Sequence, residues 1–275
     1  MSVTPVIKTV GCVPYQNAKP LIWWMERCAN PIPAEVLFEE PSQLPRMLYT
    51  GQIDAMLTSS YEALKTDGLK IVNSASISSY QEVGSVKIFS KVPPESIKSL
   101  ALDQSSLTSI HLAQIILRER YGAAPKVQYL PPDLSSMLQK TDAAVIIGDR
   151  CIHAQCADLY KLDLGAEWNK LTGKPFVWAL WMGQDHLDAQ LASVLVQSKE
   201  WGLRNLKQII PVISKQKGWS LEFCSHYYQK NLNFDFTEEH LEGLLLFREY
   251  LLKHSFLQES RLPEVLEIAK RALVY

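Results

Sequence analysis

The chain has 275 residues, of which 47% are hydrophobic and 21% are charged, so it can bury one large core or two smaller ones. Its 28 Lys and Arg residues nearly balance its 29 Asp and Glu residues, and like charges form no run. This balance argues against a surface for nucleic acid or an anionic membrane, so any anion site must be local.

The N-terminal residues and the cysteines indicate a cellular compartment. Residues 1–8 contain neither the basic segment nor the apolar segment of an export signal, and no apolar run is long enough to span a bilayer. We therefore expect a cytoplasmic protein with no membrane partner. An odd number of scattered cysteines favours reduced, mostly buried thiols over disulfides. These residues are Cys12, Cys28, Cys151, Cys156 and Cys224.

Strand-like and helix-like segments alternate over residues 1–90. The expected strands are 6–13, 35–38, 53–57, 69–73 and 83–90, and the expected helices between them are 18–28, 42–49 and 59–65. This alternation predicts an α/β fold. The double proline Pro93-Pro94 follows and indicates a crossing between two lobes.

A second set of alternating segments follows the prolines. Its expected strands are 100–102, 127–130, 143–147, 159–162 and 175–182, and its expected helices are 110–120, 134–139 and a short one after Gly148-Asp149. From His186 onward the pattern is helical only. We interpret residues 1–90 plus 183–275 as a discontinuous lobe I and residues 91–182 as lobe II, which is the connectivity of a hinge-closing binder.

Five turns at strand ends are small and polar, namely 11–21, 58–61, 77–85, 105–109 and 148–149. Because ligands of open α/β sheets bind beyond the carboxyl ends of the strands, these turns are expected to face the cleft. Together they would supply neutral donors that hold carboxylates without a salt bridge. The turn 105–109 leads into a helix, and such a helix start binds anions, although Ser and Thr are also ordinary N-caps.

Familiar catalytic and metal-binding patterns are missing from the sequence. There is no glycine-rich phosphate loop, no G-x-S-x-G and no H-E-x-x-H. Cys151, His153 and Cys156 do not share a helix face, so we expect no metal site. The aromatic residues of the C-terminal region, Tyr227 and Tyr228 among them, are expected to pack in the core.

The chain carries five motifs in order. They are Gly11-x-Val13-x-Tyr15-x-Asn17-x-x-Pro20-Leu21, Gly84-Ser85-Val86 with Phe89-Ser90, Ala101-Leu102-Asp103-x-x-Ser106-x-Thr108-Ser109, Ile146-Ile147-Gly148-Asp149, and Asp163-Leu164-Gly165-x-Glu167-Trp168 with Thr172-Gly173-x-Pro175-Phe176-Val177. In this order and spacing they resemble the chorismate dehydratase family of the futalosine route to menaquinone. The family would also place a proline within 58–60 and a glycine near Gln81, and this chain has neither.

The resemblance implies a two-lobed periplasmic-binding-protein-like type II fold with a ligand cleft between the lobes and a helical C-terminal region. It also implies a cytoplasmic lyase that converts chorismate into 3-[(1-carboxyvinyl)oxy]benzoate and water, with no cofactor. Carried over by position, Asn17 and Ser85 lie nearest the chemistry. The expected substrate-binding residues are Tyr15, Ser59, Ser79, Ser106, Thr108, Ser109, Gly148 and Asp149. Of these, Ser106, Thr108 and Ser109 would hold a carboxylate, and the oligomeric state stays open.

The general base of this reaction is the open question within the resemblance. The polar turns contain only three carboxylates, Glu82, Asp103 and Asp149, and the last two are equally good capping residues. We therefore hypothesise that the substrate's own enolpyruvyl carboxylate takes the proton. Asn17 and Ser85 would then orient the enolpyruvyl arm and the departing hydroxyl.

Three other functions share the expected fold. A transport solute-binding protein would carry an export signal or lipid anchor, and the sensing part of a transcription regulator would follow a helix-turn-helix with a basic face. A later lyase of the same route, which acts on a cyclic de-hypoxanthine futalosine, fits the turn from Tyr15 to Asn17 poorly. A solute-binding or sensing protein for a small carboxylate is the main alternative.

Overall fold

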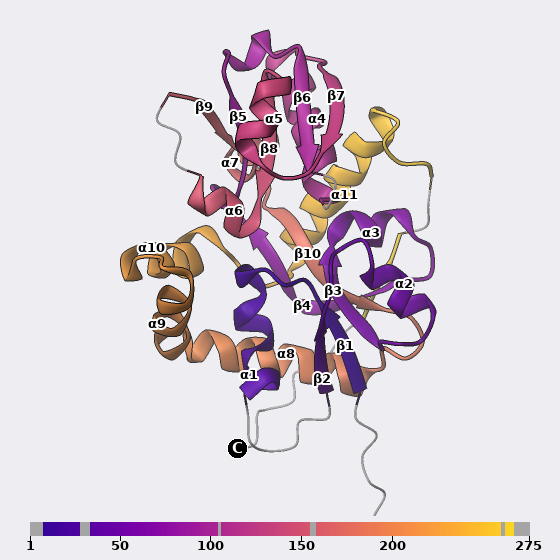
Figure 1. Ribbon diagram of the computed structural model, residues 1–275. Coiled ribbons are helices and arrows are strands. Elements are labelled where there is room, and N and C mark those ends of the chain that lie inside the picture. Colours follow the sequence, from indigo (N-terminus) through magenta and orange to yellow (C-terminus); the bar gives the residue numbers. More distant parts are fainter. Residues whose placement is uncertain (1–7, 28–33, 104–105, 155–157, 260–261, 267–275) are drawn as a thin grey trace, which may run out of the picture.

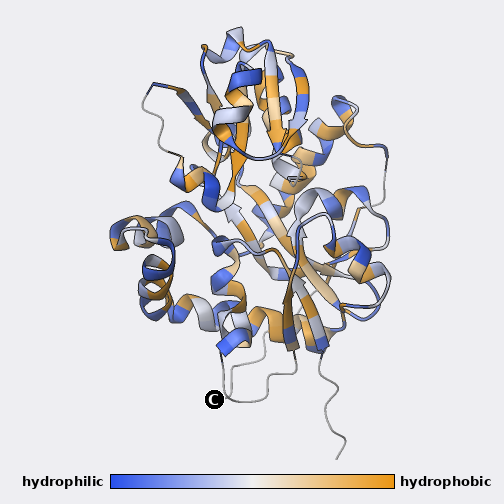
Figure 2. Cartoon of the chain, in the orientation of Figure 1, coloured by the Kyte–Doolittle hydropathy of each residue, from blue (hydrophilic) through white to orange (hydrophobic). Residues whose placement is uncertain are grey.

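The computed structural model describes residues 8–27, 34–103, 106–154, 158–259 and 262–266. Two β-sheets form its centre, and Figure 1 shows the five-stranded sheet above the six-stranded one. In Figure 2 hydrophobic residues concentrate in the strands, while the surrounding helices also carry hydrophilic residues. The α/β class predicted from the alternating segments is confirmed. Cys28, Ser105 and Cys156 lie outside the described residues, and Cys12, Cys151 and Cys224 are buried free thiols.

The six-stranded sheet consists of β1 (Lys8–Cys12), β2 (Ala34–Phe38), β3 (Ala55–Ser59), β4 (Lys70–Ser79), β10 (Phe176–Gly183) and β11 (Glu264–Leu266). Their order in the sheet is β11-β4-β10-β3-β1-β2. Strand β1 is parallel to both β2 and β3, as βαβ connections require. Strand β10 arrives from late in the chain and runs antiparallel between β3 and β4. This sheet therefore joins the beginning of the chain to its last third.

The five-stranded sheet consists of β5 (Val86–Ser90), β6 (Ser99–Asp103), β7 (Lys126–Leu130), β8 (Ala143–Ile147) and β9 (Tyr160–Asp163), in the order β7-β6-β8-β5-β9. Strand β6 is parallel to β7 and β8, and β5 is antiparallel to β8 and β9. Buried residues on one side of this sheet join the main core, whereas Phe89, Met137 and Ile146 belong to a separate small cluster. The two faces of the sheet therefore pack in two different hydrophobic clusters.

The helices cover both sheets. In the first two thirds of the chain they are α1 (Lys19–Arg27), α2 (Leu44–Tyr49), α3 (Ser60–Lys65), α4 (Thr108–Tyr121), α5 (Leu134–Lys140), α6 (Gly148–His153) and α7 (Leu164–Thr172). The C-terminal region adds α8 (Ala189–Arg204), α9 (Leu206–Lys217), α10 (Leu221–His226) and α11 (Glu238–Lys253). Helix α8 packs against α1, and α11 contacts strand β10 of the six-stranded sheet and helix α4, which follows β6 of the other sheet (Figure 1). None of the helices in the described ranges combines the length and hydrophobicity of a membrane crossing.

The chain does not pass from one sheet to the other at the double proline. Strand β5 follows β4 and already belongs to the five-stranded sheet, while β10 belongs to the six-stranded sheet. Pro94 begins a short 3-10 turn, η2 (Pro94–Ser96), between two strands of the same sheet. The division into two lobes stays an interpretation. If each lobe is defined by its sheet, lobe II begins at β5 instead of at residue 91 and ends before β10 instead of at residue 182.

Three elements differ from the expected pattern. Strand β4 continues to Ser79, which was expected in a turn. Helix α7 follows β9 directly, because the carboxylate of Asp163 accepts the amide hydrogens of Gly165 (3.0 Å) and Ala166 (3.2 Å) and so caps the helix. The C-terminal region is not helical throughout, since β11 pairs with β4.

Candidate active site

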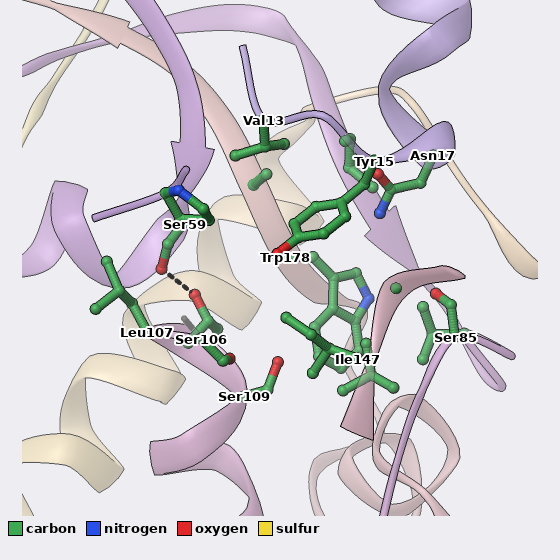
Figure 3. A pocket seen from close by; sticks show the side chains of 17 residues that line it. Val13, Tyr15, Asn17, Ser59, Ser85, Ser106, Leu107, Ser109, Ile147 and Trp178 are labelled. Carbon is green, nitrogen blue, oxygen red and sulfur yellow. Dashed lines mark hydrogen bonds between the residues drawn. The ribbon is translucent and has the colours of Figure 1, made fainter. Parts of the chain in front are cut away.

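A cavity of about 80 Å³ lies between the two sheets, with room for several water molecules. Four of the turns that line it follow the carboxyl ends of β1, β3, β6 and β8, as expected for an open α/β sheet. In Figure 3, Asn17 and Ser85 lie on one side of the Trp178 ring, and Ser59, Ser106 and Ser109 lie on the other. The cavity thus has a polar group at each end and an aromatic wall between them.

The turn after β1 carries Tyr15 and Asn17 into the cavity. It closes with a single 3-10 turn, η1 (Gln16–Ala18), which continues into α1. The Oδ1 atom of Asn17 is buried and has no hydrogen-bond partner within the described part of the chain. Because buried polar atoms are almost always hydrogen-bonded in native proteins, this amide is poised to bind a ligand.

The turn before β5 places Ser85 in the cavity wall. Gly84 adopts a φ of 75°, a conformation that side chains disfavour, and its amide and that of Val83 donate to the Asp163 carboxylate at 2.8 and 2.9 Å. Ser85 is fully buried, and its Oγ accepts a hydrogen bond of 2.9 Å from Tyr227. The proton of the Ser85 hydroxyl is therefore left to donate into the cavity.

The opposite end of the cavity is formed by the start of α4. Ser106, Thr108 and Ser109 are all buried there, beside the positive end of the helix dipole. The hydroxyl of Thr108 forms a hydrogen bond with that of Ser59 at the end of β3 (Figure 3), and it also accepts from the amide of Tyr61 at 3.4 Å. Uncharged donors from both sheets therefore meet at this end.

Tyr15 and Gly148 close the cavity from opposite sheets. Gly148 has a φ of 63°, and a Cβ atom at this position would lie 3.1 Å from Cδ1 of Tyr15. The glycine is therefore required both for its backbone conformation and for the close approach of the tyrosine ring.

No carboxylate, imidazole, lysine or arginine lines this cavity among the described residues. Asp103 and Asp149 instead line an outer cavity of about 610 Å³, which shares Tyr15 and Ile147 with the inner one. Asp149 also forms an ion pair of 2.8 Å with Lys217, and Glu82 is exposed. Within the described ranges, His, Cys, Asp and Glu form no group of three that could hold a metal ion.

The structure brings eight of the ten candidate residues to the inner cavity. These are Tyr15, Asn17, Ser59, Ser85, Ser106, Thr108, Ser109 and Gly148. Asp149 lines the outer cavity but not the inner one. Ser79 lies behind the wall of the inner cavity, where its Oγ accepts a hydrogen bond of 3.0 Å from the indole of Trp178. The chemical roles of all ten residues remain predictions.

The sequence reasoning missed the apolar half of the site. Trp178 lies on β10, and every residue of β10 is buried, so nothing in its composition distinguishes the side chains that face a ligand. The apolar lining consists of Val13, Pro41, Ile77, Val83, Val86, Leu107, Ile147, Trp178 and Ala179. Tyr227 was also missed, because its contact with Ser85 joins residues 142 positions apart.

The sequence matches a protein family and a curated relative over most of its length. Residues 8–253 match the model of a family described as menaquinone biosynthesis. A chorismate dehydratase from Thermus thermophilus is 28% identical over 262 residues, which covers 85% of this chain and 96% of that protein. The match therefore extends over nearly all of the relative.

Two solved structures share the fold at low sequence identity. A protein from Archaeoglobus fulgidus has a TM-score of 0.72 at 16% identity and covers 91% of this chain and 98% of its own. The periplasmic aliphatic sulphonate binding protein SsuA from Escherichia coli has a TM-score of 0.64 at 12% identity, with coverages of 99% and 97%. These likenesses confirm the expected periplasmic-binding-protein-like fold.

Proposed function

Because the chain belongs to the menaquinone biosynthesis family, we propose that it is a chorismate dehydratase. In this proposal it is a cytoplasmic carbon–oxygen lyase that converts chorismate into 3-[(1-carboxyvinyl)oxy]benzoate and water, in the first step of the futalosine route. The observation that carries the proposal is a cavity lined by uncharged donors at both ends, with an aromatic wall between them. Such a cavity suits a small cyclic dianion.

In the proposed complex the two ends of the cavity hold different parts of chorismate. The hydroxyls of Ser106, Thr108 and Ser109 and the start of α4 bind the C1 carboxylate. Trp178 lies against the ring, and Asn17 and Ser85 hold the enolpyruvyl arm and the C4 hydroxyl. Removal of the C3 hydrogen sends negative charge through the ring diene towards the C1 carboxylate, where one fixed donor typically stabilises the transition state by about 3 kcal/mol.

The substrate's enolpyruvyl carboxylate is the proposed base. It removes the proton from C3, the C4 hydroxyl leaves, and the two together yield water and an aromatic ring. Support comes from the lining, because the described residues offer no carboxylate or imidazole to the inner cavity. Asn17 has a free acceptor and Ser85 a free donor, so together they can orient a hydroxyl and a carboxylate.

Incubating the purified protein with chorismate and following a new benzoate chromophore tests this function. We expect turnover by the wild-type protein, and losses of orders of magnitude in Asn17→Ala and Ser85→Ala with unchanged far-UV circular dichroism. A solute-binding or sensing protein would bind chorismate without converting it, so binding without a chromophore would refute the proposal.

Three carboxylate variants serve as controls for the base. Glu82→Gln, Asp103→Asn and Asp149→Asn should each retain turnover, because none of these side chains reaches the inner cavity. One variant that still binds chorismate but loses all activity would assign the proton transfer to that side chain.

A further inference from the structure

One turn of the C-terminal region reaches both candidate catalytic turns. It is the π-helical turn η3 (Tyr227–Asn231), which follows α10 directly. Turns of this kind are rare and occur frequently at functional sites. Three of its side chains, Tyr227, Tyr228 and Asn231, donate hydrogen bonds to segments that lie far away in the sequence.

Tyr227 holds Ser85. Its hydroxyl donates to Ser85 Oγ at 2.9 Å, and its ring packs on Gly84, where a Cβ atom would lie 3.6 Å from Cδ2. The exposed fractions are 1% for Tyr227 and 0% for Ser85, so water does not compete for this bond. Burial raises the pKa of the phenol, which keeps it a neutral donor. The Ser85 hydroxyl is thereby fixed as a donor towards the cavity.

Tyr228 holds the turn that carries Asn17. Its hydroxyl donates to the carbonyl oxygen of Gln16 at 2.7 Å, and Gln16 and Asn17 are consecutive residues of the same 3-10 turn. Tyr228 is 1% exposed and packs edge to face on Tyr227 at 5.3 Å between ring centroids. The two tyrosines thus pack as one buried pair.

Two further contacts hold η3 and its tyrosines in place. Phe223 of α10 stacks on Tyr227 with 12° between the rings, and Asn231 donates to the carbonyl oxygen of Glu82 at 3.0 Å. The segment before Ser85 is therefore held by η3 at Glu82 and by the Asp163 carboxylate at Val83 and Gly84. Packing alone would need only the aromatic rings, yet each tyrosine hydroxyl is bonded to a residue of a candidate catalytic turn.

We propose that Tyr227 and Tyr228 are positioning residues of the reaction, which orient Ser85 and Asn17 respectively towards the substrate. This inference rests on the proposed dehydratase function. Displacing a reacting group by about 1 Å can cost roughly a hundredfold in rate, so hydroxyls that fix the groups contribute to turnover without touching the substrate.

Tyr227→Phe and Tyr228→Phe test the proposal, because each removes a hydroxyl and keeps the ring. We expect kcat to fall by about tenfold to a hundredfold in each variant, with KM little changed. Tyr121→Phe is the matched control: it removes a hydroxyl that donates to Glu167 at 2.7 Å, away from the cavity. This control should lose stability to a similar extent in thermal unfolding and keep the wild-type kcat.

A double variant separates positioning from stability. In the Ser85→Ala background, Tyr227→Phe should lower the residual rate no further, whereas Tyr228→Phe should still lower it, because Tyr228 acts through the other turn. Wild-type kcat in both single Phe variants would overturn the proposal. Losses no larger than that of Tyr121→Phe would overturn it as well.

Crystal structures of Tyr227→Phe and the wild-type protein distinguish failure of this proposal from failure of the proposed function. We expect the Ser85 side chain to adopt a different rotamer, or several, in the variant. An unchanged Ser85 rotamer would overturn the positioning role whatever the substrate is. Absence of chorismate turnover by the wild-type protein, together with a displaced Ser85, would instead refute the dehydratase function and leave the positioning of Ser85 standing.

Discussion

Asn17 offers the cavity a hydrogen-bond acceptor, and Ser85 offers it a donor. The Asn17 side-chain oxygen is buried with no partner within the described residues, while the Ser85 oxygen already accepts from Tyr227. An unsatisfied buried acceptor destabilises the free protein by about 1–3 kcal/mol, and a donor on a ligand removes that cost. Asn17 therefore favours a ligand hydroxyl, and Ser85 favours a ligand oxygen that accepts.

His111 gives the protein a component of acid sensitivity. It lies on α4 between the rings of Tyr61 (4.4 Å) and Phe256 (5.2 Å), and its Nδ1 has no partner in the described chain. Burial, assisted by the charge of Lys65, lowers its pKa from 6.5 to about 4. Between these two values the unfolded state binds a proton that the folded state does not, so stability falls as the pH drops through this window.

Replacing His111 by phenylalanine tests this sensitivity, because the new ring fits between the same two neighbours. We expect His111→Phe to lose less free energy of unfolding than the wild-type protein when the pH falls from about 7 to about 5. Urea unfolding at both pH values measures the difference. His186→Ala, at an exposed position, is the control and should behave like the wild-type protein. Equal losses in all three proteins would contradict the assignment to His111.

At the level of single residues, the polar half of the site could be predicted and the apolar half could not. Ser59 ends β3, and Ser106 and Thr108 follow β6, so the expectation that small hydroxylic residues at strand ends face the cleft is met at these three positions. Ser79 was expected there too, but it lies at the end of β4, and its hydroxyl bonds to Trp178 behind the wall. The role of Tyr227 depends on a tertiary contact that no local pattern reveals.

Among the elements, α8 supports the site through α1. Gly202 of α8 lies against the carbonyl group of Pro20 at the start of α1, so closely that an added Cβ atom would overlap the oxygen. Helix α1 continues directly from the 3-10 turn that carries Asn17. The close approach of the two helices therefore fixes the orientation of the candidate catalytic amide.

Gly202→Ala should separate α1 from α8. Because the overlapping group is backbone and cannot rotate away, we expect a loss of about 3 kcal/mol in the free energy of unfolding. The turnover of the protein that remains folded should fall with it. Gln197→Ala on the same helix, at a half-buried position, should change neither quantity. An unchanged urea midpoint for Gly202→Ala would show that the two helices tolerate the extra volume.

Most strands and helices could be predicted because their apolar periodicity is strong, and β8 has the expected bounds of 143–147. The missed elements have weak local signals. Helix α7 begins at an Asp163 cap that also binds the turn before β5, so its start is fixed by a tertiary contact as much as by its own sequence. Strand β11 is three residues long and exists only through its pairing with β4.

On the scale of the whole molecule, residues at the strand ends of one sheet contact turns and helices attached to the other, around the cavity. Ser59 of β3 bonds to Thr108 of α4, Tyr15 packs on Gly148, and the amide of Gln16 donates to Asp149 at 3.4 Å. These contacts bring turns from the two sheets together around the inner cavity. We infer that these contacts break and that the two proposed lobes separate when a substrate enters.

A covalent link between Ser59 and Thr108 tests whether this opening is required for turnover. Because the two hydroxyl oxygens are hydrogen-bonded across the cavity, the sulfur atoms of a Ser59→Cys, Thr108→Cys double variant can form a disulfide under oxidation. We expect the oxidised double variant to lose nearly all turnover of chorismate and to regain the activity of its reduced form after treatment with dithiothreitol. The two single cysteine variants account for the loss of each hydroxyl and should not respond to oxidation. Full turnover by the cross-linked protein, with the disulfide confirmed by mass spectrometry, would mean that substrate enters and product leaves without separation of the lobes.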